Sequence, residues 1–266
     1  MSNSKILSNI SNIVRFNIIE QTYLKKSGHL GGSLSCADIL INLFHNYIFN
    51  NKKNKFILSK GHCALSLYSV LYQAKKLSKK NFNSFANQGT LFGEHPSPKI
   101  KNKYINFSTG SLGHGLSFGS GIAYSKVLKK KAGYTFVLMS DGEMNSGTVW
   151  ESAMLSSKLN LANLIVIVDY NKFQATGKSN EILNIKPLNE KWKSFGWKVL
   201  ECNGNNHESI SSSLKKIFKD QKKPKILIAH TIKGKGIDFM ENDNNWHYRS
   251  PSRDELIKSK KQLGIK

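Results

Sequence analysis

Apolar residues follow two different periodicities along the chain. Residues 3–25 and 35–50 carry apolar side chains three and four positions apart, which predicts helices with one buried face. Further on, short runs rich in Ile, Leu, Val and Phe indicate buried strands. These runs are KFILS (55–59), YTFVLMS (134–140), LIVIVDY (164–170), WKVLEC (197–202) and the start of PKILIAHTIKGKG (224–236).

Helical patterning returns in the segments between these runs. It covers GHCALSLYSVLYQAKKL (61–77), GSLGHGLSFGSGIAYSKVLKK (110–130), and residues from about 147 to 159, 187 to 195 and 207 to 219, while residues 80–109 are rich in loop-forming residues. Apolar runs that alternate with helices predict an α/β fold, with a parallel sheet covered by helices on both faces. No repeat or low-complexity linker divides the chain, so we expect a single domain over residues 1–266.

The strongly basic composition raises the question of nucleic-acid binding, because a formal net charge of +23 attracts phosphate backbones. The 40 basic residues include only three arginines, Arg15, Arg249 and Arg253, and Asn and Ile are also abundant. This pattern is typical of coding bias, and the lysines are scattered along the sequence. We expect no nucleic-acid partner; a steep dependence of DNA or RNA affinity on salt would favour the alternative.

Two further classes of protein are disfavoured by the sequence. No stretch approaches the roughly 18 apolar residues of a membrane helix, and the first residues lack the unbroken apolar segment of a signal peptide. The cysteines, Cys36, Cys63 and Cys202, are odd in number and lack metal-ligand spacing, which indicates unpaired thiols in a reducing compartment. We therefore expect a cytoplasmic protein without membrane contact.

Polar residues directly follow two of the predicted strands. Asp141 comes after YTFVLMS and Asn171 after LIVIVDY. Because parallel strands end at the same edge of a sheet, both residues should lie there, where α/β folds bind ligands. A carboxylate and an amide oxygen suit Mg²⁺ held together with a phosphorylated cofactor. The same positions also suit a helix cap at Asp141 and a turn at Asn171, and their spacing alone does not decide between the two interpretations.

Several motifs together resemble a known family. In order and spacing, they resemble the N-terminal, thiamine diphosphate-binding part of transketolase. The segments are SGHLGGSLSCAD (27–38), LSKGHCALSLYSVL (58–71), FGEHPSP (92–98), STGSLGHGLSFGSGIA (108–123), SDGEMNSGTVWESAMLSSKLNLANLIVIVDYN (140–171) and TIKGKGIDFMENDNNWH (231–247). The resemblance implies a thiamine diphosphate-binding fold, with Mg²⁺ held by the side chains of Asp141 and Asn171 and by the backbone carbonyl of Phe173.

The resemblance also implies the cofactor contacts. Gly110, Ser111 and Leu112 would touch the cofactor through their main chain, since glycine allows a backbone to approach a flat ring closely. Gly142 and Glu143 would lie over the diphosphate.

Four histidines are implied at the substrate channel, namely His29, His62, His95 and His247, with His62 and His247 also near the cofactor. Imidazoles both donate and accept hydrogen bonds near neutral pH, which suits proton transfer during carbon–carbon bond cleavage. His45, His207 and His230 lie outside the motifs.

Three positions depart from the family pattern. Ser140 stands where glycine is usual, His114 where glutamine is usual, and Ser146 where an acidic residue is usual. By resemblance, the position of Ser146 lies where two active sites of a dimer communicate. The loss of the acidic residue at this position puts in question both the usual coupling between the two active sites and the usual reaction.

The family's remaining cofactor contacts belong to a second, pyrimidine-binding domain, which carries an activating glutamate and the sugar-phosphate clamp. The sequence ends at Lys266, soon after TIKGKG. We therefore expect a separate C-terminal subunit, an α₂β₂ assembly, and transfer of a two-carbon ketol unit between sugar phosphates. There are two alternatives. The chain could belong to a split enzyme that catalyses another thiamine diphosphate-dependent carboligation or decarboxylation, or it could be a non-catalytic homologue. Cofactor binding by the complex would distinguish the non-catalytic homologue from the enzymes.

Overall fold

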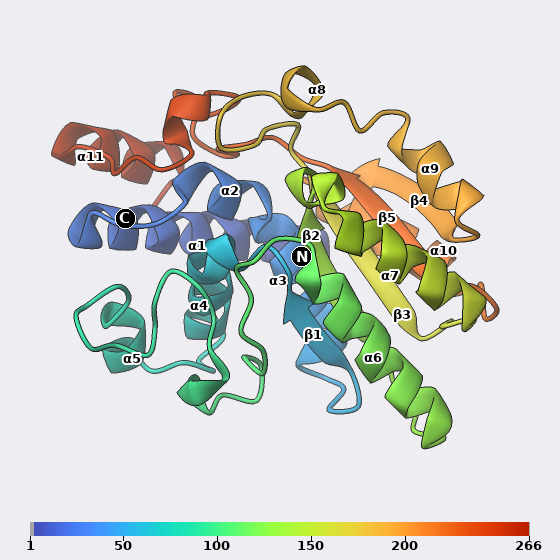
Figure 1. Cartoon of the computed structure of the whole chain (residues 1–266). Helices are drawn as coiled ribbons and strands as arrows, with labels where there is room; N and C mark the ends of the chain where they lie inside the picture. The colour runs from blue at the N-terminus through green and yellow to red at the C-terminus, as the bar shows by residue number, and fades with distance from the viewer. Residues whose placement is uncertain (1–2, 266) are drawn as a thin grey trace.

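Five parallel strands form the centre of the molecule (Figure 1). The structure is a computed structural model that describes residues 3–265. The strands are β1 (Lys55–Leu58), β2 (Thr135–Ser140), β3 (Leu164–Tyr170), β4 (Lys198–Asn203) and β5 (Lys225–His230). They lie in the order β1-β2-β3-β5-β4, and every neighbouring pair is parallel. The predicted fold class is confirmed. Each of the five apolar runs corresponds to one strand, and β4 extends one residue beyond its run, to Asn203.

The sheet is buried because successive side chains of each strand enter two separate cores. On β2, Phe136 and Leu138 join one apolar cluster, whereas Val137 and Met139 join the other. This explains why the central strands read as continuous apolar runs without polar alternation. The edge strand β4 differs, since most of its residues are partly or fully exposed.

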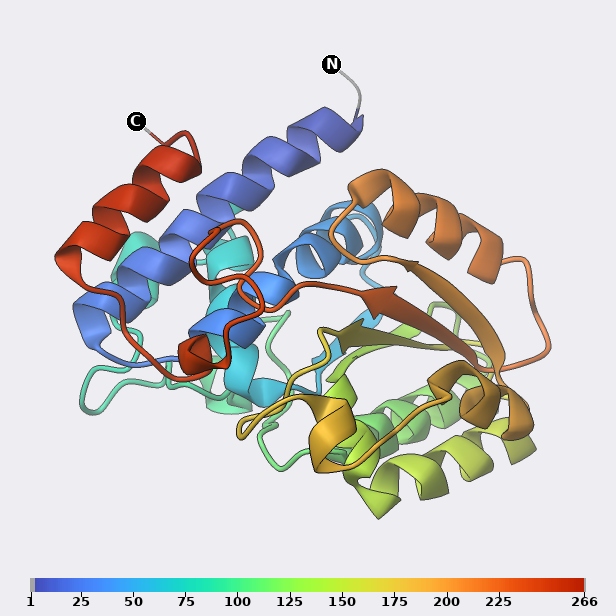
Figure 2. The ribbon, with the colours of Figure 1, turned by 90° about the horizontal axis from the view of Figure 1, so that it is seen from above.

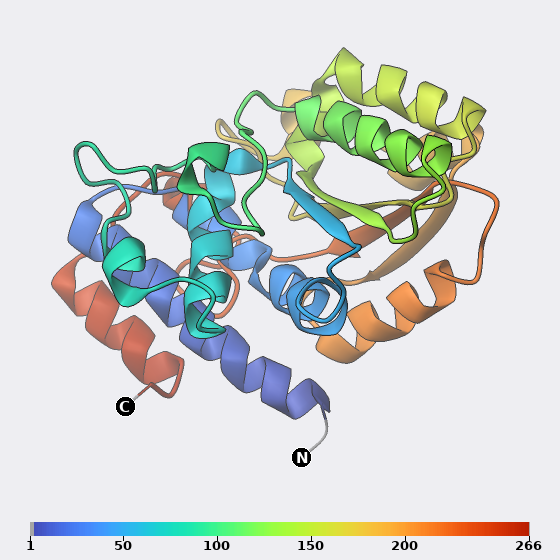
Figure 3. The same cartoon turned by 90° about the horizontal axis from the view of Figure 1, so that it is seen from below.

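Helices cover both faces of this sheet. The helices are α1 (Asn3–Lys25), α2 (Leu30–Ser35), α3 (Ala37–Leu43), α4 (Ala64–Gln73), α5 (Lys79–Asn83), α6 (His114–Leu128), α7 (Gly147–Lys158), α8 (Ser179–Ile182), α9 (Leu188–Ser194), α10 (His207–Ile217) and α11 (Arg253–Gln262). Viewed from above, α6, α7 and α9 lie on one side and α3 and α10 on the other (Figure 2). The view from below shows α1 and α4 side by side, with α11 along α1 (Figure 3).

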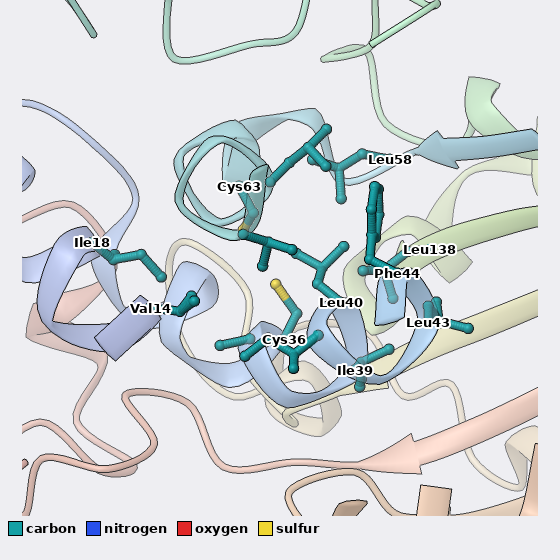
Figure 4. Packing of buried hydrophobic residues seen from close by; sticks show 14 of the residues in the cluster. Val14, Ile18, Cys36, Ile39, Leu40, Leu43, Phe44, Leu58, Cys63 and Leu138 are labelled. Atoms are coloured by element: carbon teal, nitrogen blue, oxygen red, sulfur yellow. The ribbon is translucent and has the colours of Figure 1, made fainter. Parts of the chain in front are cut away.

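The first core fills the space between α1, α3, α4 and the sheet. Val14 and Ile18 of α1 lie on one side of this cluster, Leu40 of α3 lies near its centre, and Leu58 and Leu138 of the strands lie on the other side (Figure 4). These side chains are between 0 and 3% exposed. At roughly 25 cal/mol per Å² of buried apolar surface, this cluster is a principal source of folding free energy.

The boundaries of several elements differ from the sequence prediction. The helix expected over residues 35–50 begins at Ala37 and changes into a π-helical turn, Phe44–Ile48. The helix expected over residues 61–77 begins with a 3₁₀ turn, Gly61–Cys63, and α4 ends at Gln73. Helix α11 was not predicted because its sequence is mostly polar; a capping box of Ser252 and Glu255 marks its start.

The carboxyl ends of the strands meet at one edge, and the loops that follow them form a common surface. None of the described helices is long and apolar enough to cross a membrane. The glycine-rich loop before α6 joins this edge, where Gly113 takes a left-handed backbone with φ of 85°.

The contact between α6 and the sheet generates a stability prediction. A Cβ at Gly119 would lie 2.4 Å from Cγ2 of Val137, whereas a Cβ at Gly121 would meet nothing within 4 Å. Gly119→Ala should therefore lower the free energy of unfolding by about 1–3 kcal/mol because it overpacks this contact. Gly121→Ala, on the exposed face, should be neutral or raise it by roughly 0.5–1 kcal/mol. Urea unfolding of both variants measures the difference, and equal stabilities would contradict the described packing.

Candidate active site at the carboxyl edge of the sheet

A cavity of about 290 Å³ opens at the carboxyl edge of the sheet. It gathers loops from distant parts of the sequence. Nine of the predicted site residues line it: His29, His62, His95, Gly110, Leu112, Gly142, Asn171, Phe173 and His247. The structure thus brings together residues that are up to 218 positions apart, since His29 and His247 share this wall.

The four predicted histidines form one cluster around the cavity. The ring centroid of His29 lies 5.2 Å from that of His62, 6.4 Å from that of His95 and 5.3 Å from that of His247. His29 precedes α2 and His62 lies in the turn after β1, while the other two come from irregular segments. Burial lowers the pKa of His29 and His95.

A buried lysine contacts the fourth histidine of this cluster. Nζ of Lys233 lies 3.0 Å from Nδ1 of His247 and 3.2 Å from the carbonyl of Gln174, to which it donates a hydrogen bond. Burial, with the charge of Lys233 second, lowers the pKa of His247 to about 4. Burial also lowers the pKa of Lys233 to about 8. At neutral pH, His247 is therefore an uncharged imidazole.

Asp141 lies just beneath the cavity wall, between the wall residues Ser140 and Gly142. Its Oδ2 accepts hydrogen bonds from the Lys172 amide at 3.0 Å and from the Ser179 hydroxyl at 2.8 Å. Over the described residues, no cationic side chain forms an ion pair with this carboxylate. Burial raises the pKa of Asp141 to about 7. The site therefore holds a buried acid whose anionic form lacks a paired cation.

Asn171 follows β3 at the same edge, as predicted, and lines the cavity. Its Oδ1 accepts a hydrogen bond from the Phe173 amide at 3.0 Å, and its amide nitrogen donates to Ser35 at 3.2 Å. Between Asn171 and Phe173, Lys172 has a φ of 71°, a left-handed conformation that non-glycine residues seldom adopt. The hydrogen bond from Lys172 to Asp141 thus joins the two predicted metal-ligand segments.

Two of the predicted cofactor residues, Glu143 and Ser111, lie outside the cavity lining. The Glu143 side chain is fully buried and accepts hydrogen bonds from the amides of Gly113 at 3.1 Å and Ser140 at 3.0 Å, and from the Ser59 hydroxyl. This carboxylate does not line the cavity and instead holds the glycine-rich loop against the strand ends. Ser111 is exposed and also lies outside the cavity lining.

Several cavity residues were missed by the sequence analysis. Lys60 is fully buried and pairs with Asp169, which is also fully buried. Burial alone would lower the pKa of Lys60, but the Asp169 carboxylate raises it well above its usual value. Lys60, Gln174 and Lys233 line the cavity. The sequence could have indicated these residues, because each follows a predicted strand or lies within one of the quoted motifs.

Of the three departures from the family pattern, Ser140 lines the cavity, whereas His114 and Ser146 lie outside its lining, as do His207 and His230. His207 is buried, with Nε2 2.9 Å from the Ser11 hydroxyl, and His230 pairs with Glu201. His114 is exposed, and the Ser146 hydroxyl lies 3.4 Å from the carbonyl of Leu112, a cavity residue.

The described residues contain no group of three or more His, Cys, Asp or Glu side chains that could hold a metal ion. Any metal at this edge would therefore need amide or backbone oxygens beside Asp141. Asn171 and the backbone of the following residues have that chemistry.

The strand-end loops of this parallel sheet bring together a buried carboxylate, an amide, a glycine-rich turn and two buried lysines. This arrangement is typical of domains that bind a cofactor through its diphosphate. Residues 6–266 match the family model described as "Transketolase, thiamine diphosphate binding domain". The chain belongs to this family, which confirms the resemblance drawn from the motifs.

Relatives of similar length support the same assignment. The chain is 34% identical over 256 residues to one subunit of the apulose-4-phosphate transketolase of Phocaeicola vulgatus, covering 94% of this chain and 90% of that protein. It is 32% identical over 249 residues to the SqwG subunit of the 6-deoxy-6-sulfo-D-fructose transketolase of Clostridium sp., covering 91% and 90%.

Transketolase of Campylobacter jejuni superposes with a TM-score of 0.91 at 26% identity. The match covers 99% of this chain but 43% of that one, so the described fold corresponds to less than half of the larger enzyme.

The buried Lys60–Asp169 pair generates the second prediction. Lys60→Met should lower the free energy of unfolding by about 3–5 kcal/mol because Asp169 is left as an uncompensated buried charge. Lys178→Met is the control, since its pair with Glu181 is exposed and contributes at most about 1 kcal/mol. Chemical denaturation of both variants measures the contrast, and a loss for Lys60→Met no larger than for the control would contradict it.

Proposed function

We propose that this chain is the diphosphate-binding subunit of a two-subunit transketolase, which transfers a two-carbon ketol unit between sugar phosphates. The observation that carries the proposal is the cluster of His29, His62, His95 and His247 beside the paired strand-end residues Asp141 and Asn171. Uncharged imidazoles suit sugar hydroxyls because each can donate one hydrogen bond and accept another.

The residues present fit thiamine diphosphate and Mg²⁺. The Asp141 carboxylate is buried without a paired cation among the described residues, which is the chemistry that a divalent ion completes. Lys60 and Lys233 line the same cavity and favour an anionic diphosphate. A Cβ at Gly110 would lie 2.8 Å from Cδ2 of His95, so this loop packs more closely than a side chain allows.

The metal ion would be held by the side-chain oxygens of Asp141 and Asn171 and by the carbonyl of Phe173. The main chain of Gly142 and Glu143 would lie over the diphosphate.

The cofactor ring would contact the main chain of Gly110, Ser111 and Leu112, with His62 and His247 close to it. When bound, the cofactor supplies the carbon nucleophile and the electron sink that carbon–carbon bond cleavage requires. The protein's own part is to orient the sugar, to exclude water and to accept or donate protons at its hydroxyls through the histidines.

A second subunit is proposed from the chemistry that the cavity lacks. None of the cavity-lining residues of the described chain is acidic, whereas the family's aminopyrimidine ring requires a glutamate. Two relatives, of which this chain covers 90% and 85%, are themselves named as subunits of a transketolase, which supports a separate second chain. We propose that this second chain supplies the glutamate and the sugar-phosphate clamp.

An apolar surface is available for such an assembly. Phe118 and Tyr124 of α6 are 44% and 38% exposed, and Met154 and Leu155 of α7 are 51% and 54% exposed. Apolar surface gathered on two neighbouring helices is typical of contacts between subunits. We propose that α6 and α7 take part in an α₂β₂ assembly.

The class of substrate is proposed from what the relatives share. They are named for apulose 4-phosphate and for 6-deoxy-6-sulfo-D-fructose, which differ in the sugar, while both names include transketolase. Ketol transfer is therefore favoured over decarboxylation. Sugars that carry an anionic group, a phosphate or a sulfonate, are proposed as the class of substrate, with sugar phosphates as the first to test.

The metal assignment is tested by removing the carboxylate. Asp141→Ala should abolish Mg²⁺-dependent binding of thiamine diphosphate to the two-subunit complex because the ion loses its only charged protein ligand. Calorimetry on the complex measures the affinity, with the exposed Asp238→Ala as the control. An unchanged affinity in Asp141→Ala would refute the assignment.

The need for a second chain is tested by reconstitution. The chain alone, given thiamine diphosphate, Mg²⁺ and xylulose 5-phosphate with an aldose phosphate acceptor, should show no ketol transfer, since no acidic group meets the aminopyrimidine. Addition of the pyrimidine-domain subunit, sought first in the adjacent reading frame, should restore transfer. Full activity of the chain alone would overturn the two-subunit proposal.

A further inference from the structure

Glu94 lies beside the histidine cluster, outside the cavity lining. It belongs to the FGEHPSP segment, and its side chain is 22% exposed. Its Oε1 accepts hydrogen bonds from the Ser27 hydroxyl and from the Tyr248 hydroxyl, the latter at 2.6 Å. Its Oε2 lies 3.4 Å from Nδ1 of His29. The carboxylate therefore links its own segment to residues 27–29 and to Tyr248, which come together only in the folded chain.

These contacts confine the ring of His29. The Tyr248 ring lies 4.8 Å from it, centroid to centroid, at an angle of 70°. His62 and His247 lie 5.2 and 5.3 Å away. Packing by three rings and one carboxylate leaves His29 little freedom to flip.

The partners of His29 decide which of its nitrogens carries the proton. Nδ1 is buried and makes no regular hydrogen bond within the described chain, so the Glu94 carboxylate is its nearest partner. An ionised carboxylate only accepts hydrogen bonds. A neutral His29 therefore carries its proton on Nδ1, and its Nε2 has a free lone pair.

His247 has the opposite arrangement. Its Nδ1 faces Nζ of Lys233 at 3.0 Å, and an amino or ammonium group is a hydrogen-bond donor. Its Nδ1 therefore accepts, and its proton lies on Nε2. Two neighbouring imidazoles in one cavity thus have opposite polarity because their partners have opposite charge.

We propose that Glu94 is a positioning residue that holds His29 in its Nδ1–H tautomer, so that His29 is the hydrogen-bond acceptor of the site and His247 the donor. For substrate, this rests on the proposed function: a sugar hydroxyl donates a hydrogen bond to Nε2 of His29, while a neighbouring sugar oxygen accepts a hydrogen bond from Nε2–H of His247. A site with this polarity selects vicinal oxygens of a polyol in one orientation.

The charge of Glu94 also contributes to the pKa of His29, and so to the pH at which His29 accepts a proton. The titratable groups that face His29 are Glu94, Tyr248, His62, His95, His247 and the Cys63 thiol. Burial lowers the pKa of His29, and the Glu94 carboxylate opposes that shift. Removal of this charge should lower the pKa of His29 further, so that the neutral form persists to lower pH.

The tautomer is measured directly on the whole chain with ¹⁵N-labelled histidine and two-bond ¹H–¹⁵N correlation spectra. The His29 signals are assigned by their loss in His29→Asn. Wild-type His29 should be in the Nδ1–H form. In Glu94→Ala it should move toward the Nε2–H form that free imidazole side chains favour. Tyr248→Phe is the control, since it removes one hydrogen bond to Glu94 but leaves the carboxylate beside His29.

Glu94→Gln keeps the shape of the side chain and guards against misfolding of the alanine variant. It should lower the pKa of His29 in the same spectra. An Nε2–H form in the wild-type chain, or an unchanged tautomer in Glu94→Ala together with an unchanged pKa in Glu94→Gln, would overturn the proposal.

The consequence for turnover is measured on the two-subunit complex. Glu94→Ala should lower kcat at least about tenfold without changing cofactor affinity, and the acid limb of kcat/KM in Glu94→Gln should move to lower pH. Unchanged kinetics in both variants would overturn the role of Glu94 in the reaction. If the wild-type complex shows no ketol transfer while the spectra give the expected tautomer, the proposed function fails and the assignment of His29 stands.

Discussion

The carboxyl edge of the sheet is organised around the buried carboxylate of Asp169 on β3. It pairs with Lys60 after β1, accepts hydrogen bonds from Ser35 at 2.6 Å and from the Thr231 hydroxyl after β5, and lies 3.4 Å from the amide nitrogen of Asn171. A buried charge is tolerated only when it is fully paired, so these four segments can reach only one common arrangement. The cavity wall follows from this arrangement, because Lys60 and Asn171 both line it.

A second buried carboxylate performs the same task for the glycine-rich loop. Glu143 accepts hydrogen bonds from the Gly113 and Ser140 amides and from Ser59, and burial raises its pKa. The two acids thus hold the strand-end loops from beneath, while the histidines face the cavity above. Rigid support of this kind is what positions a set of weakly held side chains for chemistry.

Features that depend on the local sequence pattern, namely the strands and the residues that directly follow them, could be predicted from the sequence. The strands were found because both faces of the sheet are buried, and Asp141 and Asn171 were found because each directly follows such a run. Lys60 and Lys233 were missed because buried lysines look like surface lysines in a chain so rich in them. Glu94 was missed because its role comes from Ser27, His29 and Tyr248, which lie 65 or more positions away along the sequence. Long-range pairing of this kind has no periodicity to reveal it.

The partly exposed edge strand β4 has a consequence for how the chain can contact other chains. An open strand edge is a template for pairing with another chain, yet β4 carries Lys198 and Glu201 among its exposed residues. The other edge strand, β1, is only four residues long. The charged residues on β4 and the short length of β1 both disfavour pairing of either edge strand with a strand of another chain. Any contact with another chain is thereby left to the helical layers and the strand-end loops, and the free chain is protected from fibre-like self-pairing.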